Sequence, residues 1–130
     1  MALLVHSDTE VFSKLQAGLE EKGFITIVAR DLRTALSAMT EHHFEVAIVA
    51  SRLSEGADGW PLAGVLHLVF PHALVCVVSP TEPDVLTLQA AINYGVREVY
   101  RQSSPAAEVI NSILRQLDQG SKPTGNSSVN

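Results

Sequence analysis

The side chains with the clearest chemical potential lie at the ends of two apolar runs of the chain. His6 ends the first run and is followed by Ser7 and Asp8, and Ser79 ends a later run. A histidine, a serine hydroxyl and a carboxylate are the groups of a hydrolytic triad, in which the imidazole takes the proton of the attacking hydroxyl. Neither serine is flanked by glycine, so the sharp turn that exposes a nucleophilic serine is missing. A small α/β enzyme with a cleft formed by His6 and Ser79 is therefore only an alternative hypothesis, and we expect no catalytic residue.

Phosphate-binding loops and metal sites are also disfavoured by the residue spacing. The turn after the first apolar run, His6-Ser7-Asp8-Thr9, holds no glycine, whereas nucleotide-binding loops need glycine so that the backbone can approach the phosphates. His42 and His43 are adjacent, so they do not face each other on a helix, and no cysteine and histidine spacing accompanies them. We predict neither a cofactor nor a metal ion.

Five short apolar runs recur along the chain, separated by segments with helical spacing. The runs are Ala2–His6, Phe24–Val28, Val46–Ala50, Leu74–Ser79 and Val96–Tyr100. The first, third and fourth are almost continuously apolar, which is typical of strands that are covered on both faces. Strands that alternate with helices predict a parallel sheet with crossover helices.

Capping residues mark where the five intervening helices begin and end. The helices are predicted to run from Asp8 or Thr9 to the residue before Gly23, from near Asp31 to the residue before His42, from Pro61 to Phe70, from after Pro83 to Gly95, and from Ser104-Pro105 to Asp118. The sequence therefore predicts a flavodoxin-like (β/α)5 fold, a doubly wound five-stranded parallel sheet, as a single domain in residues 1–118. Residues 119–130 offer almost nothing to bury and are predicted to be a flexible tail or a linker.

Charge and hydrophobicity narrow the classes of partner. The chain has 14 acidic and 9 basic residues, a net charge of -5, which disfavours direct nucleic-acid binding because affinity for the phosphate backbone rests on Lys and Arg. The apolar stretch Ala2–Val5 is far too short to span a bilayer, and no membrane association is expected. Cys76 lies within an apolar run and is predicted to pack as a small hydrophobe. We expect a cytoplasmic protein.

Four segments carry a resemblance to a known family. They are Ala2-Leu3-Leu4-Val5-His6-Ser7-Asp8-Thr9-Glu10-Val11, Glu45-Val46-Ala47-Ile48-Val49-Ala50, Gly56-Ala57-Asp58-Gly59-Trp60 and Tyr94-Gly95-Val96-Arg97-Glu98-Val99-Tyr100. Over residues 2–118 the chain resembles the response-regulator receiver domain of two-component signalling. In that family, two acidic residues after the first strand and an aspartate that ends the third hold Mg²⁺, and the aspartate accepts a phosphoryl group. A hydroxyl after the fourth strand and a lysine after the fifth complete the pocket.

The resemblance implies that the acidic pocket has been lost. The acidic pair falls on His6 and Ser7, and the phosphoacceptor falls on Ala50, which has no nucleophile. Asp8 matches only a further acidic residue that many members of the family carry. Since Mg²⁺ requires hard oxygen ligands, one carboxylate is not enough to make the site. The chain is therefore expected to be a degenerate pseudo-receiver that is not phosphorylated.

The remaining positions of the pocket are retained only in part. The hydroxyl falls on Ser79, whereas the lysine falls on Gln102 or on Arg101, depending on how the last strand is aligned. On the first of these alignments the aromatic position of the fifth strand falls on Val99. Asp58 lies in a glycine-flanked turn and is predicted to cap a turn or a helix rather than to accept phosphate.

The function that remains is recognition of another protein. The family often binds partners or dimerises through a face that corresponds here to residues 82–118, on which Val85, Leu88, Val99 and Tyr100 are candidate contact residues. The partner would be another protein or a second copy of this chain. An alternative is that the chain is the amino-terminal regulatory module of a longer transcriptional or output regulator.

Overall fold

Five short parallel strands form the centre of the protein. The computed structural model describes residues 1–6, 9–53 and 56–121. The strands are β1 (Ala2–Val5), β2 (Thr26–Ala29), β3 (Val46–Ala50), β4 (Leu74–Ser79) and β5 (Glu98–Arg101). They pair in the order β2-β1-β3-β4-β5, and every pairing is parallel. The predicted flavodoxin-like, doubly wound fold is confirmed, with the reversal of strand order between β1 and β3.

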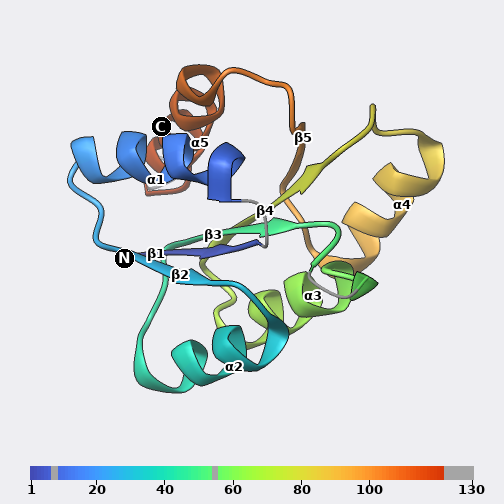
Figure 1. The fold of residues 1–130 in the computed structure, drawn as a ribbon, viewed down its shortest axis with the longest axis horizontal. Helices are drawn as coiled ribbons and strands as arrows, with labels where there is room; N and C mark the ends of the chain where they lie inside the picture. The colour runs from blue at the N-terminus through green and yellow to red at the C-terminus, as the bar shows by residue number, and fades with distance from the viewer. Residues whose placement is uncertain (7–8, 54–55, 122–130) are drawn as a thin grey trace, which may run out of the picture.

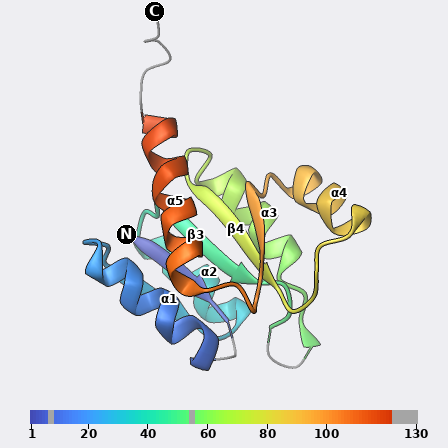
Figure 2. The same cartoon turned by 90° about the horizontal axis from the view of Figure 1, so that it is seen from above.

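Five helices cover both faces of this sheet. They are α1 (Thr9–Glu21), α2 (Leu32–Glu41), α3 (Trp60–Val69), α4 (Val85–Tyr94) and α5 (Ala106–Ser121). Figures 1 and 2 show α1 and α5 side by side on one face, with α2 and α3 on the other and α4 beside α3. Within the described part of the chain, no helix is both long enough and apolar enough to cross a membrane.

The central strands contribute side chains to two separate core layers. Leu3 and Val5 of β1 pack with α2 and α3, whereas Leu4 packs with α1 and α5. This alternation follows from the two-residue period of a strand, and it explains why β1, β3 and β4 are apolar at almost every position. Cys76 of β4 is fully buried as a free thiol, as predicted for a small core hydrophobe, and burial raises its pKa to about 12.

The predicted ends of the central strands agree with the structure better than those of the edge strands do. β3 and β4 have the predicted bounds, but β2 and β5 begin two residues later than their apolar runs. Ile25 already accepts a hydrogen bond from the amide of Ala2, but its side chain is 65% exposed because β2 lies at the edge of the sheet. Helix α5 continues past Asp118 to Ser121, since no proline interrupts it before Pro123.

Two helices begin at an aspartate cap. Asp31 accepts a hydrogen bond from the backbone amide of Thr34 at 2.8 Å, and Asp84 accepts one from that of Thr87 at the same distance. Each bond satisfies an amide that has no partner within its own helix. The same bonds hold the pKa of both carboxyl groups below the usual value. Because α4 has few contacts with the sheet, its cap is a local determinant of its stability.

We expect Asp84→Ala to lower the urea midpoint of unfolding, whereas Asp84→Asn, which retains a good capping group, lowers it much less. The hydrogen bond from Thr87 lowers the pKa of Asp84 in the folded state. The stabilisation by the charged cap is therefore present above the unfolded pKa, about 4, and is lost as the pH falls through the lowered folded value. Circular dichroism at neutral and strongly acidic pH measures this. An equal midpoint for the wild type and Asp84→Ala at neutral pH contradicts the capping role.

Candidate functional site

The candidate residues gather at the carboxyl edge of the sheet. His6 directly follows β1, Ala50 ends β3, Ser79 ends β4, and Arg101 ends β5 with Gln102 next in the chain. Parallel pairing of β1 with β3, β3 with β4 and β4 with β5 places these ends next to one another. This edge, at the reversal of strand order, is where doubly wound sheets bind ligands.

His6 is part of the core on the side of α1. Its side chain is 3% exposed, and its ring stacks on Phe12 of α1 with the two ring centroids 4.2 Å apart and the planes 20° from parallel. Its backbone amide donates a hydrogen bond to the carbonyl oxygen of Ala29 in β2, at 2.9 Å. Burial and stacking against Phe12 give this side chain a structural role. Ser7 and Asp8, the other members of the predicted cluster, lie outside the described residues.

Gly59 lies directly against the end of β3. The amide of Gly59 donates a hydrogen bond to the carbonyl oxygen of Ser51 at 2.9 Å, and a Cβ atom on Gly59 would collide with the carbonyl oxygen of Ala50. Asp58 accepts a hydrogen bond from the amide of Trp60 at 3.0 Å, so it caps the turn before α3, as predicted. Glycine at position 59 therefore allows α3 to begin directly beside the end of β3.

Gly59→Ala is expected to destabilise the protein by about 1 to 3 kcal/mol, because the added methyl group meets a backbone atom that cannot rotate away. Gly18→Ala in α1 is the matched control. There the new methyl group meets the end of the Ile110 side chain, which can move, and alanine is the better helix former. Urea denaturation of the two variants gives the comparison, and equal effects would contradict the close approach of Gly59 to Ala50.

Ser79 has the environment of a structural hydroxyl. It is 7% exposed, and its Oγ accepts a hydrogen bond from the backbone amide of Thr81 at 3.3 Å. Strand β3 lies between β1 and β4, so the backbones of His6 and Ser79 are separated by two strand spacings, about 9.5 Å. A nucleophile and its base need to be within hydrogen-bond reach of each other. A hydrogen bond between His6 and Ser79 would require both side chains to extend across the end of β3.

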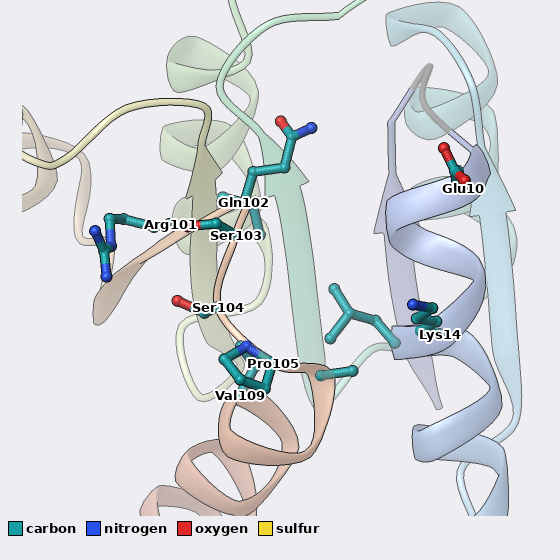
Figure 3. A pocket seen from close by; sticks show the side chains of 11 residues that line it. Glu10, Lys14, Arg101, Gln102, Ser103, Ser104, Pro105 and Val109 are labelled. Carbon is teal, nitrogen blue, oxygen red and sulfur yellow. The ribbon is translucent and has the colours of Figure 1, made fainter.

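Arg101 and Gln102 have different surroundings at the end of β5. The Nη1 atom of Arg101 lies 2.9 Å from Oε1 of Glu82, in a pair whose side chains are 53% and 74% exposed. Exposed pairs of this kind add little stability, but they orient the side chain. The amide of Gln102 donates a hydrogen bond to the carbonyl oxygen of Ser79 at 2.8 Å. Figure 3 shows the two side chains leaving the chain in different directions, with that of Arg101 pointing away from α1.

A cavity of about 320 Å³ adjoins this edge between α1, the end of β4 and the loop from β5 to α5 (Figure 3). Its lining residues are Glu10, Lys14, Leu15, Val78, Arg101, Gln102, Ser103, Ser104, Pro105, Ala106 and Val109. Glu10 and Lys14 are one helical turn apart on α1, so they bring opposite charges to the same wall. The lining combines one acid, two bases, one amide, two hydroxyl groups and apolar side chains rather than a group of carboxylates.

The described residues of the carboxyl edge do not fit a magnesium ion. His6, Ala50, Ser79 and Gln102 offer an imidazole, a methyl group, a hydroxyl and an amide, and none of them is a carboxylate. Mg²⁺ prefers carboxylate and other hard oxygen ligands in near-octahedral geometry. In the part of the chain that the structure describes, no group of three or more His, Cys, Asp or Glu side chains is placed to hold a metal ion.

The four candidate contact residues of the 82–118 face divide into two pairs. Val85 and Leu88 of α4 are 69% and 50% exposed. Val99 packs against the core layer under α2, α3 and α4, and Tyr100 packs against the layer under α1 and α5. The hydroxyl of Tyr100 donates a hydrogen bond to Oγ of Ser112 in α5 at 2.8 Å. Alternation along β5 thus directs its two candidates into opposite core layers.

Sequence reasoning missed the most exposed apolar residues. Leu68 of α3 is 79% exposed, and Leu86 and Ile92 of α4 are 74% and 78% exposed. Ala91 is the buried residue of α4, whereas Ile92 beside it is exposed to the solvent. A usable signal was the absence of any Asp, Glu, Lys or Arg in both helices, which leaves no charged side to face the solvent.

Tyr100 is expected to titrate late. Burial raises the pKa of its hydroxyl to about 12. Since the folded value exceeds the unfolded value of about 10, the stability that the neutral hydroxyl contributes is complete below pH 10 and is lost as the pH rises toward the folded value. Ultraviolet titration should show a late tyrosine transition that Tyr100→Phe removes and the control Tyr94→Phe retains. A late transition that survives in Tyr100→Phe contradicts the assignment.

Comparison with known proteins identifies the fold. Neither a scan against protein-family models nor a search of curated proteins finds a match. Among solved structures, a CheY-like response regulator receiver domain protein from Methanospirillum hungatei JF-1 is similar with a TM-score of 0.82 and 18% identity, over 92% of this chain and 94% of that one. The beryllofluoride-activated NtrC4 receiver domain dimer matches at 0.80 and 25% identity, over 92% and 98% of the two chains.

A third structure extends beyond the matched region. A response regulator from Burkholderia pseudomallei, solved with a phosphorylated aspartic acid, a calcium ion and citrate, matches at a TM-score of 0.79 and 19% identity. The match covers 91% of this chain and 68% of that one. At such identities the likeness establishes the fold, and the chain has the CheY-like receiver fold as a single domain.

Proposed function

We propose that this receiver-fold domain transmits signals without being phosphorylated and that it acts through contacts with other proteins. The observation that carries the proposal is Ala50 at the end of β3, the position at which the resemblance places the phosphoacceptor aspartate. A methyl group has no lone pair with which to attack phosphorus. A cytoplasmic location, as expected for a domain of two-component signalling, and the absence of enzymatic activity are parts of the same proposal.

The surroundings of Ala50 support the loss of phosphoryl transfer. Transfer to a carboxylate depends on a cation that neutralises the charge of the phosphoryl oxygens. The acidic position directly after β1 holds His6, whose ring is buried against Phe12. Of the two residues to which the lysine position was aligned, Gln102 carries no charge, and Arg101 is paired with Glu82.

A role in protein recognition is supported by where apolar surface remains. Val85, Leu86, Leu88 and Ile92 of α4 are each at least half exposed. Isolated exposed apolar side chains are ordinary, but several on one short helix mark a contact surface. A small-molecule role has less support, because the cavity at the carboxyl edge is near the lower limit of ligand pockets and carries charges of both signs.

The output of the domain is proposed to depend on its context in a longer protein. The Burkholderia regulator continues beyond the region that matches this chain. The alternative form of the proposal is that this chain is the amino-terminal regulatory module of a longer transcriptional or output regulator, whereas other similar receiver structures are matched over almost their whole length. A hydrolytic role for His6 and Ser79 has less support, because the ring of His6 is stacked on Phe12 and the Oγ atom of Ser79 accepts a hydrogen bond from the amide of Thr81.

We expect acetyl phosphate and Mg²⁺ to leave no hydroxylamine-labile phosphate on the wild-type protein, as measured by intact mass. Ala50→Asp alone is expected to remain unmodified, because the new carboxylate lacks a bound cation beside it. The combined variant His6→Asp, Ser7→Asp, Ala50→Asp and Gln102→Lys, which rebuilds the family pocket, is expected to gain the adduct.

Two controls make this experiment decisive. Thermal unfolding followed by circular dichroism establishes that the combined variant is folded, and a nuclear magnetic resonance titration of the wild type with Mg²⁺ reports on the cation itself. Saturable shifts at Ala50 and Ser79, or a stable adduct on the wild type at Asp8, Ser51 or Asp58, would overturn the proposal.

A further inference from the structure

Helices α3 and α4 together expose a large apolar surface, here named the α3–α4 patch. Its members are Val65, Leu68, Val85, Leu86, Leu88 and Ile92, which are between 39% and 79% exposed. The two helices pack directly on each other, as seen beside the sheet in Figure 1. The patch is therefore carried by two adjoining helices, and Val65 and Leu68 also line the groove between them.

Neither helix, Trp60–Val69 or Val85–Tyr94, contains an acidic residue, a lysine or an arginine. A helix on the surface of a soluble protein normally places charged side chains on the side away from the core. Only Ala91 of α4 is buried, so most of this uncharged helix faces outward.

A shallow groove lies between the two helices. It has a volume of about 320 Å³ and is lined by Pro61, Gly64, Val65, His67, Leu68, Asn93 and Tyr94. A Cβ atom on Gly64 would lie 2.7 Å from the ring of Tyr94, so the absence of a side chain there lets the two helices approach each other. The patch thus offers both protruding side chains, such as Ile92 at 78% exposure, and an apolar groove to receive them.

We propose that the α3–α4 patch is a homodimer interface, in which a second copy of this chain packs its own patch against it around a two-fold axis. A two-fold interface requires a surface that is complementary to itself. The patch meets this condition because each copy supplies both the apolar projections and the groove. The inference deepens the proposed function, since the dimer would be one of the contacts through which the domain acts.

Charge favours a second copy at this position. Each chain has a net charge of -5, so two copies repel each other wherever their charged surfaces meet. The uncharged helices let two acidic copies approach without desolvating ionised groups. The β5 and α5 part of the 82–118 face lacks this property, since it carries Glu98, Arg101, Glu108 and Arg115 as exposed residues.

The available apolar area is of the size that a dimer needs. A stable interface buries about 800 Å² on each partner. Each of the six patch side chains would remove on the order of 100 Å² of apolar surface from water when fully buried. The patch therefore supplies a substantial part of the required area, and the side chains at its rim supply the rest.

Sedimentation velocity over a range of protein concentrations tests the interface. We expect the wild type to dimerise, and Leu68→Asp and Ile92→Asp each to weaken the dimer at least about tenfold, because each would bury a charge against an apolar partner surface. Ile25→Asp is the matched control. It places the same charge at an apolar residue that is 65% exposed but lies outside the patch, directly before the edge strand β2, and it should leave the dimer unchanged.

A monomeric wild type throughout the concentration range overturns the proposal and leaves the patch as a surface for a different protein. A dimer that resists both patch variants, or that Ile25→Asp weakens equally, also overturns it. Thermal unfolding establishes that each variant is folded, and Leu68→Ser and Ile92→Ser replace any aspartate variant that is not. A monomer without a phosphate adduct contradicts only this inference, whereas an adduct on a dimeric wild type contradicts only the proposed function.

Discussion

Burial of the three central strands on both faces is the constraint from which the rest of the structure follows. Their side chains alternate between two core layers, so almost every position must be apolar, and each fully buried aliphatic side chain contributes about 1.5 to 3 kcal/mol. Helices must cover both sides of such a sheet. The crossovers that place them there also bring all the strand ends of the same polarity to one edge, which creates the candidate site.

A receiver pocket and a hydrophobic core require different residues at the carboxyl edge, and this chain has residues that suit the core. A receiver pocket requires carboxylates at the ends of β1 and β3, and burying such charges is costly unless a cation compensates them. His6 stacks on Phe12, and Ala50 packs against both core layers. A strand edge built from such residues is stable without a bound ion.

The surface of helix α4 is determined by residues other than those at the ends of β1 and β3. It begins at the Asp84 cap and ends at Gly95, which adopts a left-handed conformation with a φ of 72°. Between these ends it is uncharged, and Ala91 is its buried residue. The residues at the carboxyl edge of the sheet are different from those on the surface of α4, so substitutions at the edge need not change the surface of α4.

The sequence alone determined the parallel sheet, the bounds of β3 and β4, and the absence of an acceptor carboxylate at position 50. Periodicity and residue identity are local properties, and continuous burial leaves a clear pattern. Only the tertiary structure decided that Val99 and Tyr100 pack against the core, that Arg101 pairs with Glu82, and that Ile92 is exposed. The physical reason is that the burial of a helix or an edge strand depends on which other elements pack against it. The sequence of an apolar helix does not show whether another element packs on it.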